Sequence, residues 1–100
     1  MKTTIVPLAL AELQEATAFY SERAGAGLGL AFVAEFERVA KIIQGNPLAG
    51  TAIRVNRLAY PLRRFPYSVM YYLAEDSELR IIAVAHQRRR PNYWDRNGNP

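Results

Sequence analysis

The spacing of apolar residues changes once along this chain, near Gly50, and that change limits the folds open to it. Before Gly50, apolar residues recur at helical spacing in two stretches, which predicts helices over residues 8–23 and 28–43. The glycine-rich segment 24–27 separates them, so we expect an antiparallel helical hairpin with a short connection. After Gly50 the spacing becomes strand-like, which indicates that the helices pack on a sheet.

Short β-branched or alternating segments predict the strands of that sheet. They lie at residues 3–6, 53–55, 62–65, 67–73 and 79–87, the second being the shortest. Strands this close in sequence pair antiparallel as a meander. Counted without the shortest segment, at 53–55, these strands predict an α+β fold of order β-α-α-β-β-β, with a helical hairpin on one face of a small, mainly antiparallel sheet. It forms a single domain over residues 1–94, followed by a short C-terminal tail at 95–100.

Composition excludes several kinds of site. The chain has no cysteine and one histidine, so a disulfide framework and a thiolate metal site are impossible, and we expect neither metal nor cofactor. Its longest apolar runs are about seven residues, against about 20 for a membrane span. The N-terminus faintly resembles a secretion signal, but Pro7 interrupts it and Glu12 follows at once. We expect a soluble, cytoplasmic protein.

Both faces of the strands at 67–73 and 79–87 carry apolar residues. Strict alternation places Ile82 and Val84 on one face of the last strand, and Ile81 and Ala83 on the other. Two helices cover only one side of a sheet, so we expect the second apolar face to be left for a partner.

Positive charge is concentrated in the second half. Residues 1–50 carry four basic and five acidic side chains (4 − 5 = −1), and residues 51–100 carry nine and four (9 − 4 = +5). All nine of those basic residues are arginine, which binds phosphate and carboxylate through a planar fork. The last predicted strand runs directly into His86, an arginine triplet at 88–90 and an aromatic pair at 93–94. Groups of this kind hold phosphate, stack on bases or anchor a partner.

Six motifs, in this order and spacing, resemble those of the RelE/ParE toxin superfamily of bacterial toxin–antitoxin pairs. They are Pro7-x-Ala9, Glu12-Leu13-x-Glu15-Ala16-x-x-x-Tyr20, Gly29-x-x-Phe32, Asn46-Pro47-x-x-Gly50, Arg64-Phe65-Pro66-Tyr67-x-Val69-x-Tyr71 and Val84-Ala85-His86-x-Arg88-Arg89-x-Pro91-x-Tyr93-Trp94. The resemblance covers residues 3–94 and implies the same β-α-α-β-β-β fold. It also implies a small cytoplasmic toxin that a cognate antitoxin holds inactive, by wrapping an extended or helical segment around it. We expect that segment to contact Tyr20, Phe36, Arg54, Arg64, Met70 and Tyr72.

The superfamily has two activities, and the resemblance favours one of them. ParE-like members bind DNA gyrase, whereas RelE-like members cut mRNA on the ribosome. RelE-like enzymes carry arginines where this chain has Ser68 and Gln87. We therefore expect a ParE-like toxin without enzymatic activity, which contacts gyrase through Arg88, Arg89, Arg90, Tyr93 and Trp94.

Two alternatives stay open at this point. A metal-independent, ribosome-dependent mRNA endonuclease would use His86 for acid–base chemistry, with Arg64, Arg88 and Tyr93 completing the site. Against it, one imidazole at the end of a core strand is more often structural. The other alternative is a basic nucleic-acid-binding domain without toxicity, whose binding would weaken steeply with salt.

Overall fold

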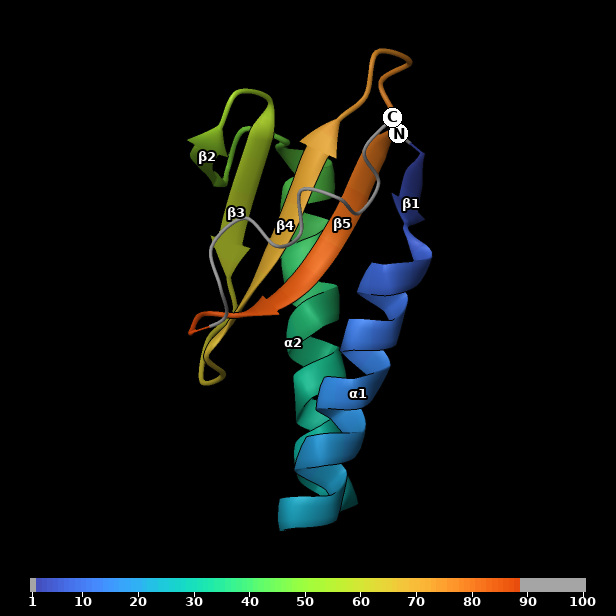
Figure 1. Cartoon of the computed structure of the whole chain (residues 1–100), viewed down its shortest axis with the longest axis vertical. Coiled ribbons are helices and arrows are strands. Elements are labelled where there is room, and N and C mark those ends of the chain that lie inside the picture. Colours follow the sequence, from blue (N-terminus) through green and yellow to red (C-terminus); the bar gives the residue numbers. More distant parts are fainter. Residues whose placement is uncertain (1, 89–100) are drawn as a thin grey trace.

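Two helices pack on one face of a five-stranded sheet in the computed structural model, which describes residues 2–88 (Figure 1). The elements are β1 (Thr3–Ile5), α1 (Pro7–Ala24), α2 (Ala26–Gly45), β2 (Thr51–Arg54), β3 (Arg57–Pro61), β4 (Tyr67–Leu73) and β5 (Leu79–His86). This α+β architecture confirms the predicted fold class and the helical hairpin. None of the described helices is long and apolar enough to cross a membrane.

The hairpin turns at a single residue, Gly25, which lies between the end of α1 and the start of α2. Its φ of 94° is a backbone conformation that side chains with a Cβ rarely adopt. Pro7 occupies the first turn of α1, where its missing N–H is not needed. The two helices extend well beyond the sheet at the Gly25 end (Figure 1), and Gly29 lies close to α1.

Gly29 and Gly27 provide a test of this helix packing. A Cβ at Gly29 would overlap Ser21 Oγ and lie 3.0 Å from the backbone oxygen of Thr17, whereas one at Gly27 meets nothing within 4 Å. We expect Gly29→Ala to cost about 1 kcal/mol of stability, and Gly27→Ala to gain about 0.5 kcal/mol from helix propensity. Urea unfolding of both variants measures this, and a gain for Gly29→Ala would contradict the close approach.

The sheet has the order β1-β5-β4-β3-β2. From β2 to β5 it is the predicted antiparallel meander, and β1 pairs parallel with β5, with Thr3 opposite Leu79 and Ile5 opposite Ile81. β5 therefore lies between the first strand of the chain and β4. β1 ends at Ile5, so beyond Ile81 this side of β5 faces α1 instead of a strand.

One predicted strand is wrong. Residues 62–65 form a turn region, and the strand before Pro66 is β3, at 57–61. Arg64 has a φ of 72°, which is incompatible with an extended strand. The short strand predicted at 53–55 is β2, displaced to 51–54, and β2 and β3 form a hairpin around Val55 and Asn56.

The main core lies between the helices and the sheet. Its largest fully buried side chains include Phe32, Val39 and Ile43 from α2 and Tyr71 from β4. The ring of Phe32 packs 5.0–5.4 Å from those of three other aromatic residues, centroid to centroid: Tyr20, Phe65 and Tyr67.

The other face of the sheet carries a second apolar cluster, formed by Tyr72, Ile82, Ala83 and Ala85. Strict alternation along β5 is wrong, because the register with β4 shifts between Tyr71–Ile81 and Met70–Ala83. That bulge places Ile81 and Val84 together in the main core. Each of these four residues is at most 5% exposed, and the expectation that this face is left for a partner stays a prediction.

Candidate functional site

His86 ends β5 beside a hollow between that strand and α1. The imidazole packs edge-on against the ring of Tyr67, with a centroid distance of 5.1 Å. The hollow has a volume of about 240 Å³ and is lined by Glu12, Glu15, Ala16, Phe19, Tyr67, Val84 and His86. Burial, and then the neighbouring Tyr20 and Glu12, raise the pKa of Tyr67 above its usual range, so its hydroxyl stays protonated at neutral pH.

Glu12 closes the edge of β5 that β1 leaves open. Its Oε1 accepts a hydrogen bond from the backbone N–H of Val84 at 3.0 Å. A carboxylate thus satisfies a strand donor that a neighbouring strand would otherwise take. This contact joins α1 to the end of β5 that carries His86.

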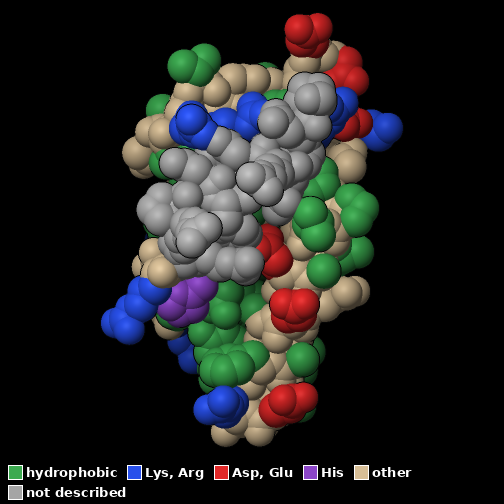
Figure 2. All heavy atoms as spheres, in the orientation of Figure 1, with side chains coloured by type: hydrophobic (Ala, Val, Ile, Leu, Met, Phe, Trp, Pro, Cys, Tyr) green, Lys and Arg blue, Asp and Glu red, His purple; other side chains and the backbone are tan. Residues whose placement is uncertain are grey.

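The backbone after β5 is held by His86. The N–H of Arg88 donates to His86 Nδ1 at 3.1 Å, so that nitrogen is an acceptor and a neutral ring carries its proton on Nε2. His86 is partly exposed and Arg88 is exposed, and the histidine side chain (purple) reaches the surface shown in Figure 2. The other predicted target-binding residues, Arg89, Arg90, Tyr93 and Trp94, lie outside the described residues.

Arg64 lies at a different place, where the β3–β4 turn meets α2. We call Arg38, Arg63 and Arg64 the arginine corner. They line a hollow of about 300 Å³ together with Ala31, Ala34, Glu35 and Phe65. Glu35 accepts both arms of the Arg38 fork, each at 2.7 Å, and the backbone N–H of Arg63. The hydrogen bonds from Arg38, together with that N–H, hold the pKa of Glu35 below its ordinary value.

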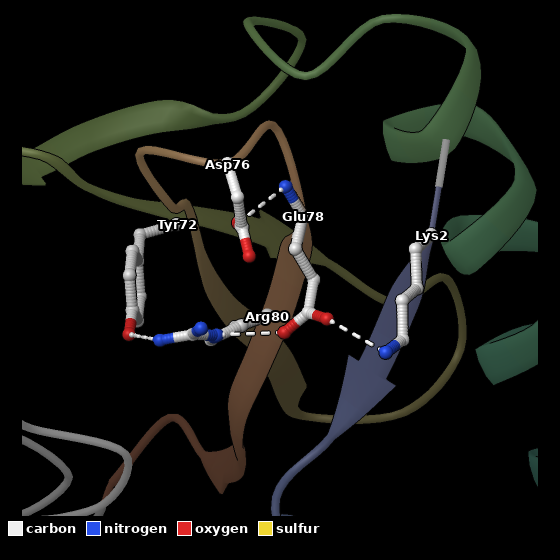
Figure 3. Close-up of polar contacts among 5 residues, drawn as sticks. All are labelled: Lys2, Tyr72, Asp76, Glu78 and Arg80. Atoms are coloured by element: carbon white, nitrogen blue, oxygen red, sulfur yellow. Dashed lines mark hydrogen bonds and ion pairs between the residues drawn. The ribbon is translucent and has the colours of Figure 1, made fainter.

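A third cluster lies on the sheet face opposite the helices. The hydroxyl of Tyr72 accepts a hydrogen bond from Arg80 at 3.0 Å, and Arg80 Nε donates to Glu78 at 2.8 Å (Figure 3). Lys2 pairs with the same carboxylate at 3.5 Å. The Arg57 guanidinium lies 4.1 Å from the Tyr72 ring centroid. Figure 2 shows basic and acidic side chains together at the upper end of this face.

That cluster borders a hollow of about 500 Å³, lined by Asn56, Arg57, Tyr72, Ala74, Glu75, Asp76 and Arg80. The hydrogen bond from Arg80 is the main cause of the lowered pKa of Glu78, and the same bond raises the pKa of Arg80. Both groups therefore stay charged at neutral pH. The hollow itself presents both signs of charge, from Arg57 and Arg80 and from Glu75 and Asp76.

The predicted antitoxin contacts differ in how accessible they are. Arg54 and Arg64 are exposed, and Tyr20 and Met70 are partly buried. Phe36 is a core residue at 5% exposure, so its side chain is not available on the surface, and Tyr72 is equally buried beneath Arg57. The apolar side of α2 that carries Phe36 faces the sheet, and direct antitoxin contact at Phe36 stays a prediction.

Among residues 2–88, the structure brings two of the candidate ribonuclease residues together, because the backbone N–H of Arg88 donates to His86 Nδ1. His86 and Arg64 line separate hollows, and Tyr93 lies outside this range. Ser68, on β4, is buried opposite Ala85. In the same range, no group of His, Asp and Glu side chains could hold a metal ion.

Each of the three hollows described above has a side-chain contact that the sequence pattern did not predict. The residues that make these contacts are Glu12, Glu35 and Arg57. Glu12 and Glu35 belong to the polar positions of amphipathic helices, where most carboxylates only face water. Arg57 is the first residue of β3, a strand that the sequence pattern placed at 62–65 instead.

Comparison with known proteins agrees with the fold and the motifs. The structure is similar to a solved chain described as "Chromosomal ParDE TA system from P. aeruginosa", with a TM-score of 0.75 and 21% sequence identity, over 86% of this chain and 95% of that one. No curated protein sequence matches the chain significantly. Residues 4–91 match the family described as "ParE toxin of type II toxin-antitoxin system, parDE". The chain therefore belongs to the ParE toxin family of type II toxin–antitoxin systems, within the RelE/ParE superfamily.

Proposed function

We propose that this toxin inhibits DNA gyrase by direct binding in the cytoplasm and is neutralised by a cognate antitoxin. The observation that carries the proposal is the ParE family match over residues 4–91, which includes the strand that ends at His86. The described geometry supports a contact inhibitor over an enzyme. His86 and Arg64 line separate hollows, and the contact between Arg88 and His86 is made by the backbone N–H of Arg88 and not by its guanidinium.

Ser68 and Gln87 support the same choice. A mid-strand arginine at position 68 would have to fit where Ser68 is buried between strands, opposite Ala85. Losing one such preorganised cation costs an enzyme on the order of 10²–10³ in rate. Gln87 is exposed immediately after β5 but carries no charge.

The antitoxin part of the proposal has support in the name of the similar structure and in the surface of this chain. The solved relative is described as a ParDE toxin–antitoxin system. Arg54 and Arg64 are exposed arginines to which an acidic antitoxin segment could bind, and Tyr20 and Met70 offer partly buried apolar contacts.

Replacing Arg88, Arg89 and Arg90 together by alanine tests the gyrase contact. We expect the unmodified protein to block supercoiling by its host's gyrase, and the triple variant to need at least about tenfold more protein for the same inhibition, because interface arginines are frequent hot spots. The measurement is a supercoiling assay on relaxed plasmid. Arg23→Ala, an exposed arginine at the end of α1, is the control and should inhibit like the unmodified protein.

Two results would contradict the proposal. One is supercoiling that continues at micromolar toxin. The other is cleavage of mRNA in translated codons that His86→Ala and Tyr93→Phe abolish, since that result assigns the chain to the RelE-like activity. The two assays use the same purified protein, so a misfolded preparation would show neither gyrase inhibition nor mRNA cleavage.

A further inference from the structure

The longest stretch of this chain without a carboxylate begins in the second half of α2 and ends before the β4–β5 turn. From Arg38 to Ala74 the sequence has six basic residues and no aspartate or glutamate. The six are Arg38, Lys41, Arg54, Arg57, Arg63 and Arg64. Three of them form the arginine corner, and Lys41 follows Arg38 at i+3, on the same side of α2. Grouped cations repel one another unless an anion lies nearby.

Glu35 is the one carboxylate that lines the arginine corner, and its single negative charge does not neutralise the three arginines. Its oxygens bind Arg38 and the backbone of Arg63, whose side chain is exposed. One negative charge among three guanidiniums leaves a net charge of +2. Because the lowered pKa keeps Glu35 ionised, these contacts fasten the turn to α2 at neutral pH. The two exposed guanidiniums, of Arg63 and Arg64, are therefore carried on a fixed backbone.

The backbone conformation of Arg64 indicates that its side chain has a function. Its φ of 72° is in the left-handed region, where glycine is free of strain and arginine is not. The turn is held by hydrogen bonds from Leu62 N–H to the Tyr67 oxygen at 2.9 Å, and from Tyr67 N–H to the Phe65 oxygen at 2.8 Å. Neither bond requires an arginine side chain at position 64. The Arg64 guanidinium lies 5.5 Å from the Phe65 ring, which restricts its direction.

We propose that the arginine corner binds the phosphate groups of a nucleic-acid backbone. Guanidinium forks match phosphate oxygens, and sequence-independent binding to nucleic acid depends on neutralising phosphates with such groups. The corner offers no apolar anchor for a protein interface core, because its one aromatic lining residue, Phe65, is only 5% exposed. An acidic antitoxin segment at Arg64 would therefore bind through charge and compete with nucleic acid for the corner. This site uses other residues than the proposed gyrase contact, which lies after β5.

The variant Arg64→Gly distinguishes a loss of phosphate binding from a loss of stability. The substitution removes a guanidinium and also relieves the left-handed strain, so the thermal unfolding temperature should rise or stay unchanged while binding weakens. We would measure binding to a short fluorescent DNA duplex by anisotropy over a series of salt concentrations. For Arg64→Gly and for Arg63→Ala, we expect binding to weaken about five- to tenfold at 0.1 M salt and the slope of log K against log salt to fall by about 1.

Arg23→Ala is the matched control, since it removes the same charge from an exposed site at the end of α1. It should leave the salt slope unchanged. The proposal is overturned if Arg63→Ala and Arg64→Gly bind DNA with the slope of the unmodified protein, or if Arg23→Ala weakens binding equally. Adding inorganic phosphate at matched ionic strength shows whether the corner binds the phosphates of a nucleic-acid backbone or a free phosphate ion. Competition no stronger than that of chloride supports a nucleic-acid site, and displacement of the duplex by millimolar phosphate would instead assign the corner to a free anion.

Discussion

Replacing Phe32 by alanine is expected to lower the free energy of unfolding by about 3–5 kcal/mol. Phe32 is fully buried, and its ring contacts those of Tyr20, Phe65 and Tyr67. The substitution removes the residue that joins α2 to the sheet and to the β3–β4 turn. A domain of this size has only about 5–15 kcal/mol of stability in total, so the variant should be close to unfolding. Urea denaturation followed by circular dichroism measures the change.

Leu30→Ala is the control for that experiment. It lies two residues away on the same helix and is 70% exposed, so we expect a change within about 0.5 kcal/mol. A loss for Phe32→Ala no larger than that for Leu30→Ala would show that the aromatic cluster does not hold α2 to the sheet.

Gly50→Ala is expected to cost about 2–4 kcal/mol, because the added methyl group has no room. It would lie 2.6 Å from the hydroxyl of Tyr71 and 2.9 Å from the backbone oxygen of Ala59. Tyr71 cannot move aside, since its side chain is fully buried. Its hydroxyl also accepts the N–H of Gly50 at 2.9 Å and donates to the oxygen of Pro47 at 2.8 Å. Chemical denaturation of the variant gives the loss directly.

Gly45→Ala and Tyr71→Phe identify the cause of that loss. A Cβ at Gly45 meets nothing within 4 Å, so this control should be neutral or gain about 0.5 kcal/mol from helix propensity. Tyr71→Phe removes the oxygen that the new methyl group meets. The double variant with Gly50→Ala should therefore be more stable than the sum of the single losses predicts, by about 0.5–3 kcal/mol. Strict additivity would argue against this contact.

Periodicity predicted the elements that have one apolar side and clear ends. Both helices and the strand at 67–73 lie where the pattern placed them, because glycine and proline limit them and one face of each is buried. The segment 62–65 failed for a local reason. Its residues alternate like those of a strand, but Arg64 adopts a left-handed conformation that no alternation pattern reveals.

Contacts between residues distant in sequence could not be predicted from the sequence. The parallel pairing of β1 with β5 joins segments about 75 residues apart, and neither segment carries a signal for the other. The bulge near Ile82 reverses which side chains face the helices, and it depends on pairing with β4. For the candidate site, His86 was found as the chain's one histidine, whereas the contact between Glu12 and the backbone of Val84 exists only because the fold brings α1 to the end of β5.

The position of β5 within the sheet also affects the order in which this chain can fold during its synthesis. β5 is the last of the described strands to leave the ribosome, yet it lies between β1 and β4 and is the strand neighbour of β1. Until Leu79–His86 has emerged, the first strand has no place in the sheet, and contacts this distant in sequence form late and slowly. A nascent chain therefore cannot close this sheet strand by strand as it emerges, because the place of β1 is fixed only once β5 has been synthesised.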